Sequence, residues 1–188
     1  AFLDEDAIVR QNIVKYHMYL RVPLSPLTME KLLQDSDRGV LLAALDRISM
    51  NASQPRVISE IERLSSHEDR GIRLKIVDVA RDCNRYDSRY RSILRSMTED
   101  KDAEVTSMAA VELARFGEKI NSAVIERIKN YLLSSKGMSS QVTTILYAVS
   151  AMGADGIQVY KALTEHGSSR MRTVAWQRFL SLSNGWNN

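Results

Sequence analysis

Apolar residues recur at helical spacing along this chain, and the pattern restarts five times behind a small polar residue. Each restart places an Asp or a Ser three positions before an apolar anchor. The stretches begin at Asp37, Asp69, Asp102, Ser139 and Ser168, and their anchors are Val40, Ile72, Val105, Val142 and Met171. Successive anchors lie 32, 33, 37 and 29 residues apart. A recurring unit of this length is typical of a stacked array of helices.

The first residues of each unit have the chemistry of a helix start. An Asp or Ser side chain there accepts a hydrogen bond from a free backbone N–H group, and the anchor then faces the core. Four residues after the anchors come Ala44, Ile76, Ala109, Leu146 and Ala175, and one turn later Ile48, Ala80, Leu113, Ser150 and Phe179. One helix pair cannot bury such a stripe, whereas stacked pairs can.

The whole pattern predicts an opening helix and five helix pairs within one domain, residues 1–188. Asp4, Glu5 and Asp6 favour a helix start at residue 4, and Pro23 ends this element. The opening helix is predicted over residues 4–20, in an N-terminal capping segment of residues 1–22. Gly117 is a predicted helix stop. The pairs fill residues 25–183 and comprise 25–34 with 37–50, 55–64 with 69 to about 83, 87–97 with 102–116, 121–134 with 139–152, and 155–166 with 168–182. Residues 184–188 are predicted to be a loop-like tail.

Two repeats contain an apolar-Arg step behind the capping residue, Ile72-Arg73 and Met171-Arg172. With the turn Asp before the second helix, these steps resemble the HEAT and HEAT-like repeat family. Three repeats depart from its pattern, with Val40-Leu41, Val105-Thr106 and Val142-Thr143 in place of the step. The resemblance implies an all-α fold, a right-handed α-solenoid whose second helices line a concave face. Members of the family mostly bind proteins or peptides on that face, and some bind nucleic acid.

Composition places the chain among ordinary soluble globular proteins, with 44% apolar and 26% charged residues. The net charge of +3 is mild, whereas a dedicated DNA-binding domain has a more concentrated basic footprint. The single cysteine, Cys83, excludes an internal disulfide.

No run approaches the roughly 20 apolar residues that a membrane span needs, and no signal-peptide pattern is present. Since the chain begins at Ala1, cytoplasmic and processed periplasmic or secreted forms both stay open, as does the oligomeric state.

The stretch from Arg81 to Arg95 is the richest in charge, with five arginines against two aspartates and interleaved tyrosines. Guanidinium groups bind oxyanions in a forked geometry, and aromatic rings stack on a ligand. The residues expected to contact a protein or peptide partner here are Arg73, Arg81, Arg85, Tyr86, Arg89 and Tyr90. The alternative is a solvated helix face with the tyrosines packed between repeats.

A second candidate surface lies after Glu165, where the chain contains no acidic residue. Arg172 and Trp176 are expected to contact a partner, because Trp and Arg are favoured in the energetic centres of interfaces. An alternative is that Trp176 fills the last repeat's core while Trp186 covers its open end. A further alternative is that this end docks on another domain or subunit.

Motifs for catalysis or metal binding are not found. The chain has no GxSxG elbow, glycine-rich phosphate loop, HExxH sequence or paired CxxC. His67-Glu68 resembles the His-Glu pairs that hold iron in HEAT-like deoxyhypusine hydroxylases, but that site needs several pairs and this chain has one. Arg81 and Arg85 favour a lowered pKa for Cys83, yet no histidine is near it in the sequence, and a buried or incidental thiol is expected. No catalytic residue, metal ligand or cofactor is therefore predicted.

The leading hypothesis is a non-catalytic HEAT-like scaffold that binds a protein or peptide on the face of its second helices. One alternative is nucleic-acid binding, since HEAT-like DNA glycosylases hold a duplex on a basic concave face. Another is an enzyme on the same scaffold, such as the HEAT-like phycobilin lyases, because a fold does not dictate its function.

Overall fold

The computed structural model of this chain describes residues 2, 4–20 and 24–185. All regular structure in these ranges is helical, with eleven α-helices, three short 3₁₀-helices and no strand. The all-α class predicted from the sequence is confirmed. Contacts within the chain divide it into two compact units, Ala1–Ile93 and Leu94–Asn188.

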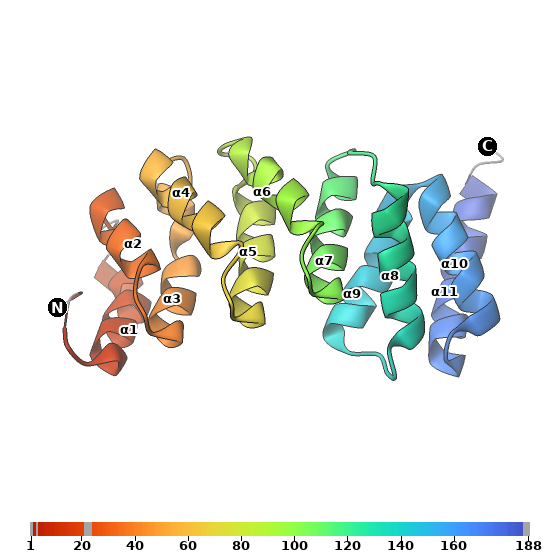
Figure 1. The fold of residues 1–188 in the computed structure, drawn as a ribbon, viewed down its shortest axis with the longest axis horizontal. Helices are drawn as coiled ribbons and strands as arrows, with labels where there is room; N and C mark the ends of the chain where they lie inside the picture. The colour runs from red at the N-terminus through yellow and green to blue at the C-terminus, as the bar shows by residue number, and fades with distance from the viewer. Residues whose placement is uncertain (1, 3, 21–23, 186–188) are drawn as a thin grey trace. The chain divides into compact units, whose positions relative to one another are not determined.

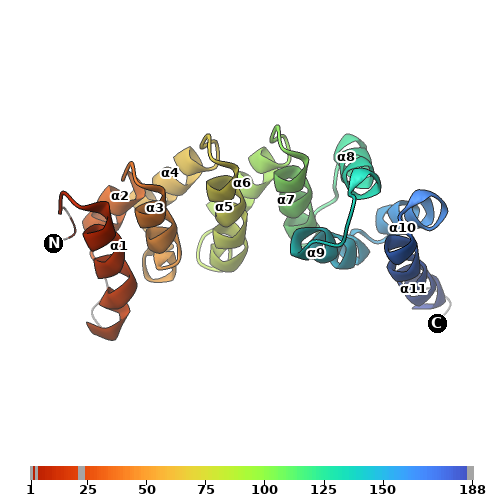
Figure 2. The same ribbon diagram turned by 90° about the horizontal axis from the view of Figure 1, so that it is seen from below.

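The first unit has two layers of helices. Its elements are α1 (Ala7–Tyr16), η1 (His17–Leu20), α2 (Pro26–Leu33), α3 (Arg38–Leu45), η2 (Ile48–Asn51), α4 (Pro55–Leu64), α5 (Arg70–Cys83) and the first part of α6 (Arg89–Met97). In one layer α1 packs on α3 and α3 on α5, and in the other α2 packs on α4. The layers meet where α2 contacts α3 and α4 contacts α5, as the two views in Figures 1 and 2 show.

The second unit is built around a buried central helix, α7. Its elements are the last part of α6, α7 (Ala103–Arg115), α8 (Ser122–Ser134), α9 (Ser140–Ala148), η3 (Val149–Met152), α10 (Ala154–His166) and α11 (Ser169–Gly185). α7 packs on α8 and α9, while α8 packs on α10 and α10 on α11. Every residue of α7 from Glu104 to Ala114 is buried.

The predicted helix starts are largely confirmed. Asp37, Asp69, Asp102 and Ser139 each accept a hydrogen bond from the backbone N–H of the anchor three residues later, at 2.9 to 3.2 Å. At the fifth start, helix α11 begins at Ser169, directly after Ser168, and its first intrahelical hydrogen bond runs from the N–H of Arg172 to the carbonyl of Ser168. The side-chain bonds of the other four starts satisfy amide groups that the first turn of a helix leaves without partners.

The predicted buried stripe is confirmed except at Ser150 and Phe179, which are only half-buried, whereas Ile48, Ala80 and Leu113 in the same row are buried. All five anchors, and all five residues four positions later, are at most 3% exposed. Alanine occupies three of these later positions, at Ala44, Ala109 and Ala175. A short side chain at these positions leaves little bulk between a second helix and its neighbours.

Several element boundaries differ from the prediction. The opening helix begins at Ala7 rather than at residue 4, because Asp6 caps it, and after Tyr16 it tightens into η1. The helix expected over 37–50 ends at Leu45 and continues, after a break, as the 3₁₀ turn η2. The helix expected over 139–152 likewise tightens into η3 after Ala148, a common way to end a helix. Helix α11 runs to Gly185 rather than Leu182, while the rest of the predicted tail, residues 186–188, lies outside the described residues. Residues 21–23, with the predicted stop at Pro23, also lie outside them.

Ion pairs between Arg and Asp link successive repeats in the first unit. Nε of Arg38 on α3 lies 2.9 Å from Oδ2 of Asp69, which caps α5. Gly71 makes room for this pair, because a Cβ atom there would lie 2.7 Å from a terminal nitrogen of Arg38. One repeat earlier, Arg10 on α1 binds Asp35 through two hydrogen bonds of 2.7 and 2.9 Å. These pairs fix how one repeat sits on the next within this unit.

The close approach of α10 to η3 at Gly156 generates a stability prediction. A Cβ atom at Gly156 would lie 2.2 Å from the carbonyl oxygen of Val149, a backbone atom that cannot move aside cheaply. We expect Gly156→Ala to lower the free energy of unfolding by about 1–3 kcal/mol, as measured by urea denaturation. Gly137→Ala is the matched control, because a Cβ there meets nothing within 4 Å. Equal losses in both variants would contradict the close approach.

The cap at Asp69 generates a prediction that depends on pH. Asp69→Ala should cost about 1 kcal/mol, and Asp69→Asn less, because asparagine still accepts the bond from Ile72. Hydrogen bonds from Ile72 and Arg38 hold the pKa of Asp69 below its ordinary value. The extra stability is therefore complete above an ordinary aspartate pKa and is lost as pH falls through the lower folded value. Thermal melts of wild type and Asp69→Ala should converge in acid; a constant difference would argue against the ionised cap.

Candidate functional site

The predicted basic stretch lies at the end of α5, in the turn that follows and on α6. Much of its positive charge is locally compensated. The ion pairs are Arg81 with Asp78 and Asp82 at 3.0 and 2.9 Å, Arg89 with Asp87 at 2.8 Å, and Arg95 with Glu118 at 2.6 Å. The hydrogen bond from Arg89 lowers the pKa of Asp87 to about 2, so this aspartate stays ionised beside its partner. The stretch therefore presents less free positive charge than its sequence indicates.

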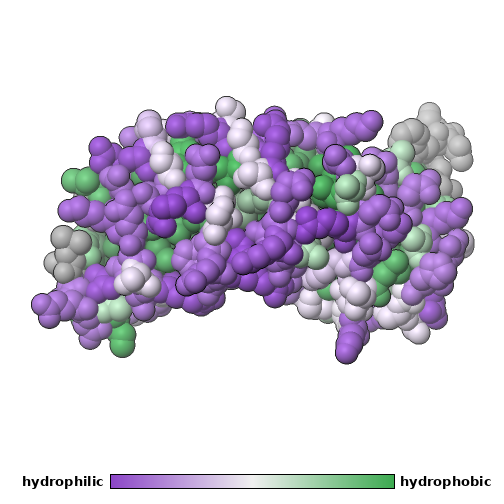
Figure 3. Space-filling model, in the orientation of Figure 1, coloured by the Kyte–Doolittle hydropathy of each residue, from purple (hydrophilic) through white to green (hydrophobic). Residues whose placement is uncertain are grey.

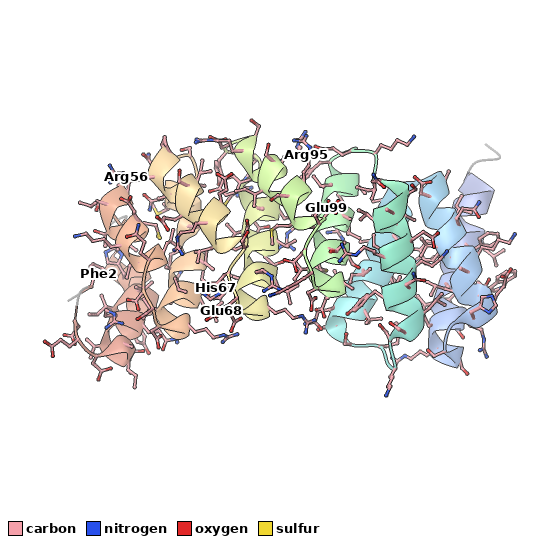
Figure 4. All side chains as sticks on the ribbon, in the orientation of Figure 1. Phe2, Arg56, His67, Glu68, Arg95 and Glu99 are labelled. Atoms are coloured by element: carbon pink, nitrogen blue, oxygen red, sulfur yellow. The ribbon has the colours of Figure 1, made fainter. Side chains whose placement is uncertain are left out.

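Two of the residues expected at the partner surface, Arg73 and Tyr90, are buried instead. Arg73 is 3% exposed, and its Nη1 donates to the carbonyls of His67 and Glu68 at 2.8 and 2.9 Å. Figure 4 labels His67 and Glu68 in the turn between α4 and α5. The hydroxyl of Tyr90 donates to the carbonyl of Ala52 at 2.9 Å, and burial raises the Tyr90 pKa. Both side chains stabilise the fold and are not accessible to a partner.

Arg85, Tyr86 and Arg89 are the exposed members of this set, and of these Arg89 is paired with Asp87. Tyr86 is 47% exposed, and Cζ of Arg85 lies 4.8 Å from the centre of its ring, within the range of a cation–π contact. Arg85 is also exposed and forms no ion pair with any described residue. The guanidinium is thus held by its tyrosine neighbour while its hydrogen-bond donors stay available.

Arg85 stands at the edge of a groove of about 310 Å³ in the first unit. The groove is formed by the end of α3, by η2 and by the second half of α5. Its lining residues are Leu45, Asp46, Ile48, Ser49, Lys75, Asp78, Val79, Asp82, Cys83 and Arg85. The volume is at the lower end of the range for small-ligand pockets.

The groove has an apolar base and walls of mixed charge. Leu45, Ile48 and Val79 are buried and form the apolar part. Lys75 on α5 forms an ion pair with Asp46 after α3. The two helices therefore meet across a charged pair. The walls of the groove contain both positive and negative side chains along its length.

Most of these lining residues were missed at the sequence level. Asp46 and Lys75 belong to different repeats, and neither forms a motif with its sequence neighbours. Aligning the adjacent repeats would have placed the end of one second helix, at Asp46, beside the middle of the next, at Lys75. This alignment is the sequence signal that could have predicted the groove.

Cys83 lies beneath the groove and is buried and free. Burial and the nearby Asp82 raise its pKa to about 11, despite the opposing charge of Arg85. The expected lowering of its pKa by Arg81 and Arg85 is therefore wrong, since desolvation outweighs their charge. The interpretation as a buried thiol is confirmed.

The second predicted surface lies on α11 and stays only partly available. Trp176 is 52% exposed and stacks on Phe179, with ring centres 5.7 Å apart and planes inclined by 14°. Arg172 donates one hydrogen bond of 2.9 Å from Nη1 to the carbonyl of Gly167. The predicted cover by Trp186 lies outside the described residues.

Metal ligands do not gather in the described ranges: no group of three or more His, Cys, Asp or Glu side chains is placed to hold an ion there. His67, the candidate iron ligand, instead accepts a hydrogen bond of 3.0 Å at Nδ1 from the N–H of Asp69. Among the helices described, none combines the length and apolar character that crossing a bilayer requires.

Comparison with known proteins shows a likeness of fold alone. No family model matches the chain, and no curated protein matches it. Among solved structures it is similar to the crystal structure of an engineered protein, Northeast Structural Genomics Consortium target OR329, with a TM-score of 0.50. The sequences are 15% identical, and the match covers 98% of this chain and 94% of that one.

The environment of Cys83 generates a prediction on thiol reactivity. At pH 8 the folded protein should react with a thiol reagent at least tenfold more slowly than the urea-unfolded chain, because both burial and a pKa of about 11 suppress the thiolate. The measurement is the rate of labelling followed by mass spectrometry. Cys83→Ser serves as the blank, and equal rates in the folded and unfolded states would contradict the burial.

Proposed function

We propose that this chain is a HEAT-like repeat module, a right-handed α-solenoid of five helix pairs behind a capping helix. Two observations support this proposal. The cap and anchor pattern recurs along the sequence. Helices α1, α3 and α5 pack in one layer, while α2 and α4 pack in another. In this arrangement the second helices of the pairs form the binding face.

The proposed activity is binding without catalysis, with a protein or peptide as the partner. The groove along α3, η2 and α5 is the site. The observation that supports this function most directly is that Arg85, which lines the groove, is exposed and lies against the ring of Tyr86. No histidine lines the groove, and its cysteine is kept in the thiol form by a raised pKa. The groove thus has the shape of a binding site without a paired base and nucleophile.

The partner segment that suits this groove is an extended peptide with an apolar side chain next to an acidic one. Burial of the apolar side chain against Ile48 and Val79 supplies the hydrophobic term. A carboxylate beside it accepts hydrogen bonds from Arg85, whose donors are not used by an internal ion pair. The ring of Tyr86 then packs along the bound segment.

The test is selection of binding peptides from a random displayed library, followed by titration of the enriched sequences. We expect Arg85→Glu with Tyr86→Ser to raise the dissociation constant of these peptides at least tenfold, or about 1.4 kcal/mol. The sequences should combine acidic and apolar residues. Fluorescence anisotropy gives the constants, and thermal melting confirms that the variant is folded.

Lys136→Glu is the matched control, since it reverses an exposed charge in the second unit. It should leave peptide affinity unchanged. If no peptide is enriched, or if affinities are the same in the groove variant and the control, the groove is not the binding site.

A further inference from the structure

The outer side of α1 exposes an unusual amount of apolar surface. Ile8 is 67% exposed and Tyr16 63%, while Val14 on the opposite side of the helix is buried. Tyr19 in η1 is 72% exposed and stacks on Tyr16 with ring centres 6.2 Å apart. Figure 3 shows hydrophobic surface at the α1 edge of the first unit among mainly hydrophilic residues. Ile8, Tyr16 and Tyr19 are called the α1 face below.

Negative charge lies beside the α1 face. Asp4, Glu5 and Asp6 precede the helix and are all exposed. Of the basic residues on α1, Arg10 is already bound to Asp35, and Lys15 is exposed near the other end of the helix. The start of this face is therefore acidic.

The exposed side of α11 has the opposite character. Trp176 is 52% exposed and Leu180 42%, one helical turn apart. Arg170 and Arg172 are exposed on the same helix, and no Asp or Glu occurs from His166 to Asn188. Trp176, Leu180, Arg170 and Arg172 are called the α11 face below.

We propose that the α1 face of one molecule binds the α11 face of a second copy, so that the protein assembles head to tail. Exposed aromatic and aliphatic side chains on both faces supply apolar area, and acidic residues at one face meet arginines at the other. Such complementarity favours the correct pairing and raises the association rate. Since the two faces differ, one contact leaves a free face of each kind, to which further copies add.

The same charges disfavour symmetric pairing. Two α1 faces would bring Asp4, Glu5 and Asp6 of both copies together, and two α11 faces would oppose arginines. Like charges at an interface are repulsive and suppress such contacts. The heterologous contact is the arrangement that satisfies both faces at once. This inference is independent of the groove.

The test is sedimentation velocity over a wide concentration range, with two variants that each lose one face. Ile8→Gln with Tyr16→Gln removes the α1 face, and Trp176→Gln with Leu180→Gln removes the α11 face. Wild type should grow beyond a dimer as concentration rises. Each variant alone should stay monomeric, with an association constant at least tenfold weaker. Their equimolar mixture should form a heterodimer through the one intact face of each, and nothing larger.

Charge exchange provides a second measurement with smaller changes to the fold. Glu5→Lys and Arg170→Glu should each weaken self-association, most at low salt, and the mixture of the two should restore it. Arg85→Glu with Tyr86→Ser should assemble as wild type does, which separates this inference from the groove. A wild type that stays monomeric at all concentrations would overturn the proposal. So would a dimer that mixing the single-face variants does not restore.

Discussion

The turn that precedes each second helix is the structural constraint on which the rest of the fold depends. Its capping residue binds the anchor's N–H, as Asp69 binds that of Ile72, and thereby fixes where the helix starts. In some of the repeats the residue one position after the anchor also binds the turn. Arg73 donates to the carbonyls of His67 and Glu68, and the hydroxyl of Thr106 donates to that of Asp100. The two side chains have little in common, but both satisfy turn carbonyls that would otherwise be left without partners near the core.

This demand explains why a chain with many arginines offers few to a ligand. Arg63 on α4 donates to the carbonyl of Leu33 at the end of α2, and Arg127 on α8 donates to that of Asp100. Arginine is suited to this role because its several donors reach across a repeat and bind a carbonyl on the next one. Net charge therefore says little here about nucleic acid or acidic partners. What matters is which arginines, such as Arg85, have donors that the internal structure does not use.

The sequence predicts the helices well and the candidate site less well, for different physical reasons. Caps and anchors depend on contacts over three or four residues, so the pattern around Asp37 and Val40 defines the local structure. The burial of Tyr90 depends on a carbonyl of Ala52 in another repeat. The groove likewise needs Asp46 and Lys75 to meet across two helices. Tertiary contacts of this kind are not encoded in any short motif. A prediction made from a charge-rich stretch alone therefore treats buried structural side chains as exposed ones.

Helices α1 and α3 lie in the same layer but differ in how many of their residues are buried. Interior helix α3 buries residues on several sides, including Leu41, Ala43 and Leu45, because neighbours cover it all round. Helix α1 buries Val14 against the unit but keeps Ile8 and Tyr16 outside, so its apolar residues also suit more than one side. An apolar pattern on two sides of a helix favours a neighbour on each. The exposed side of α1 is of mixed character, since Asn12 and Lys15 are exposed together with Ile8 and Tyr16. Layer packing thus covers α3 with neighbours and leaves apolar side chains of α1 exposed beside the acidic residues Asp4, Glu5 and Asp6.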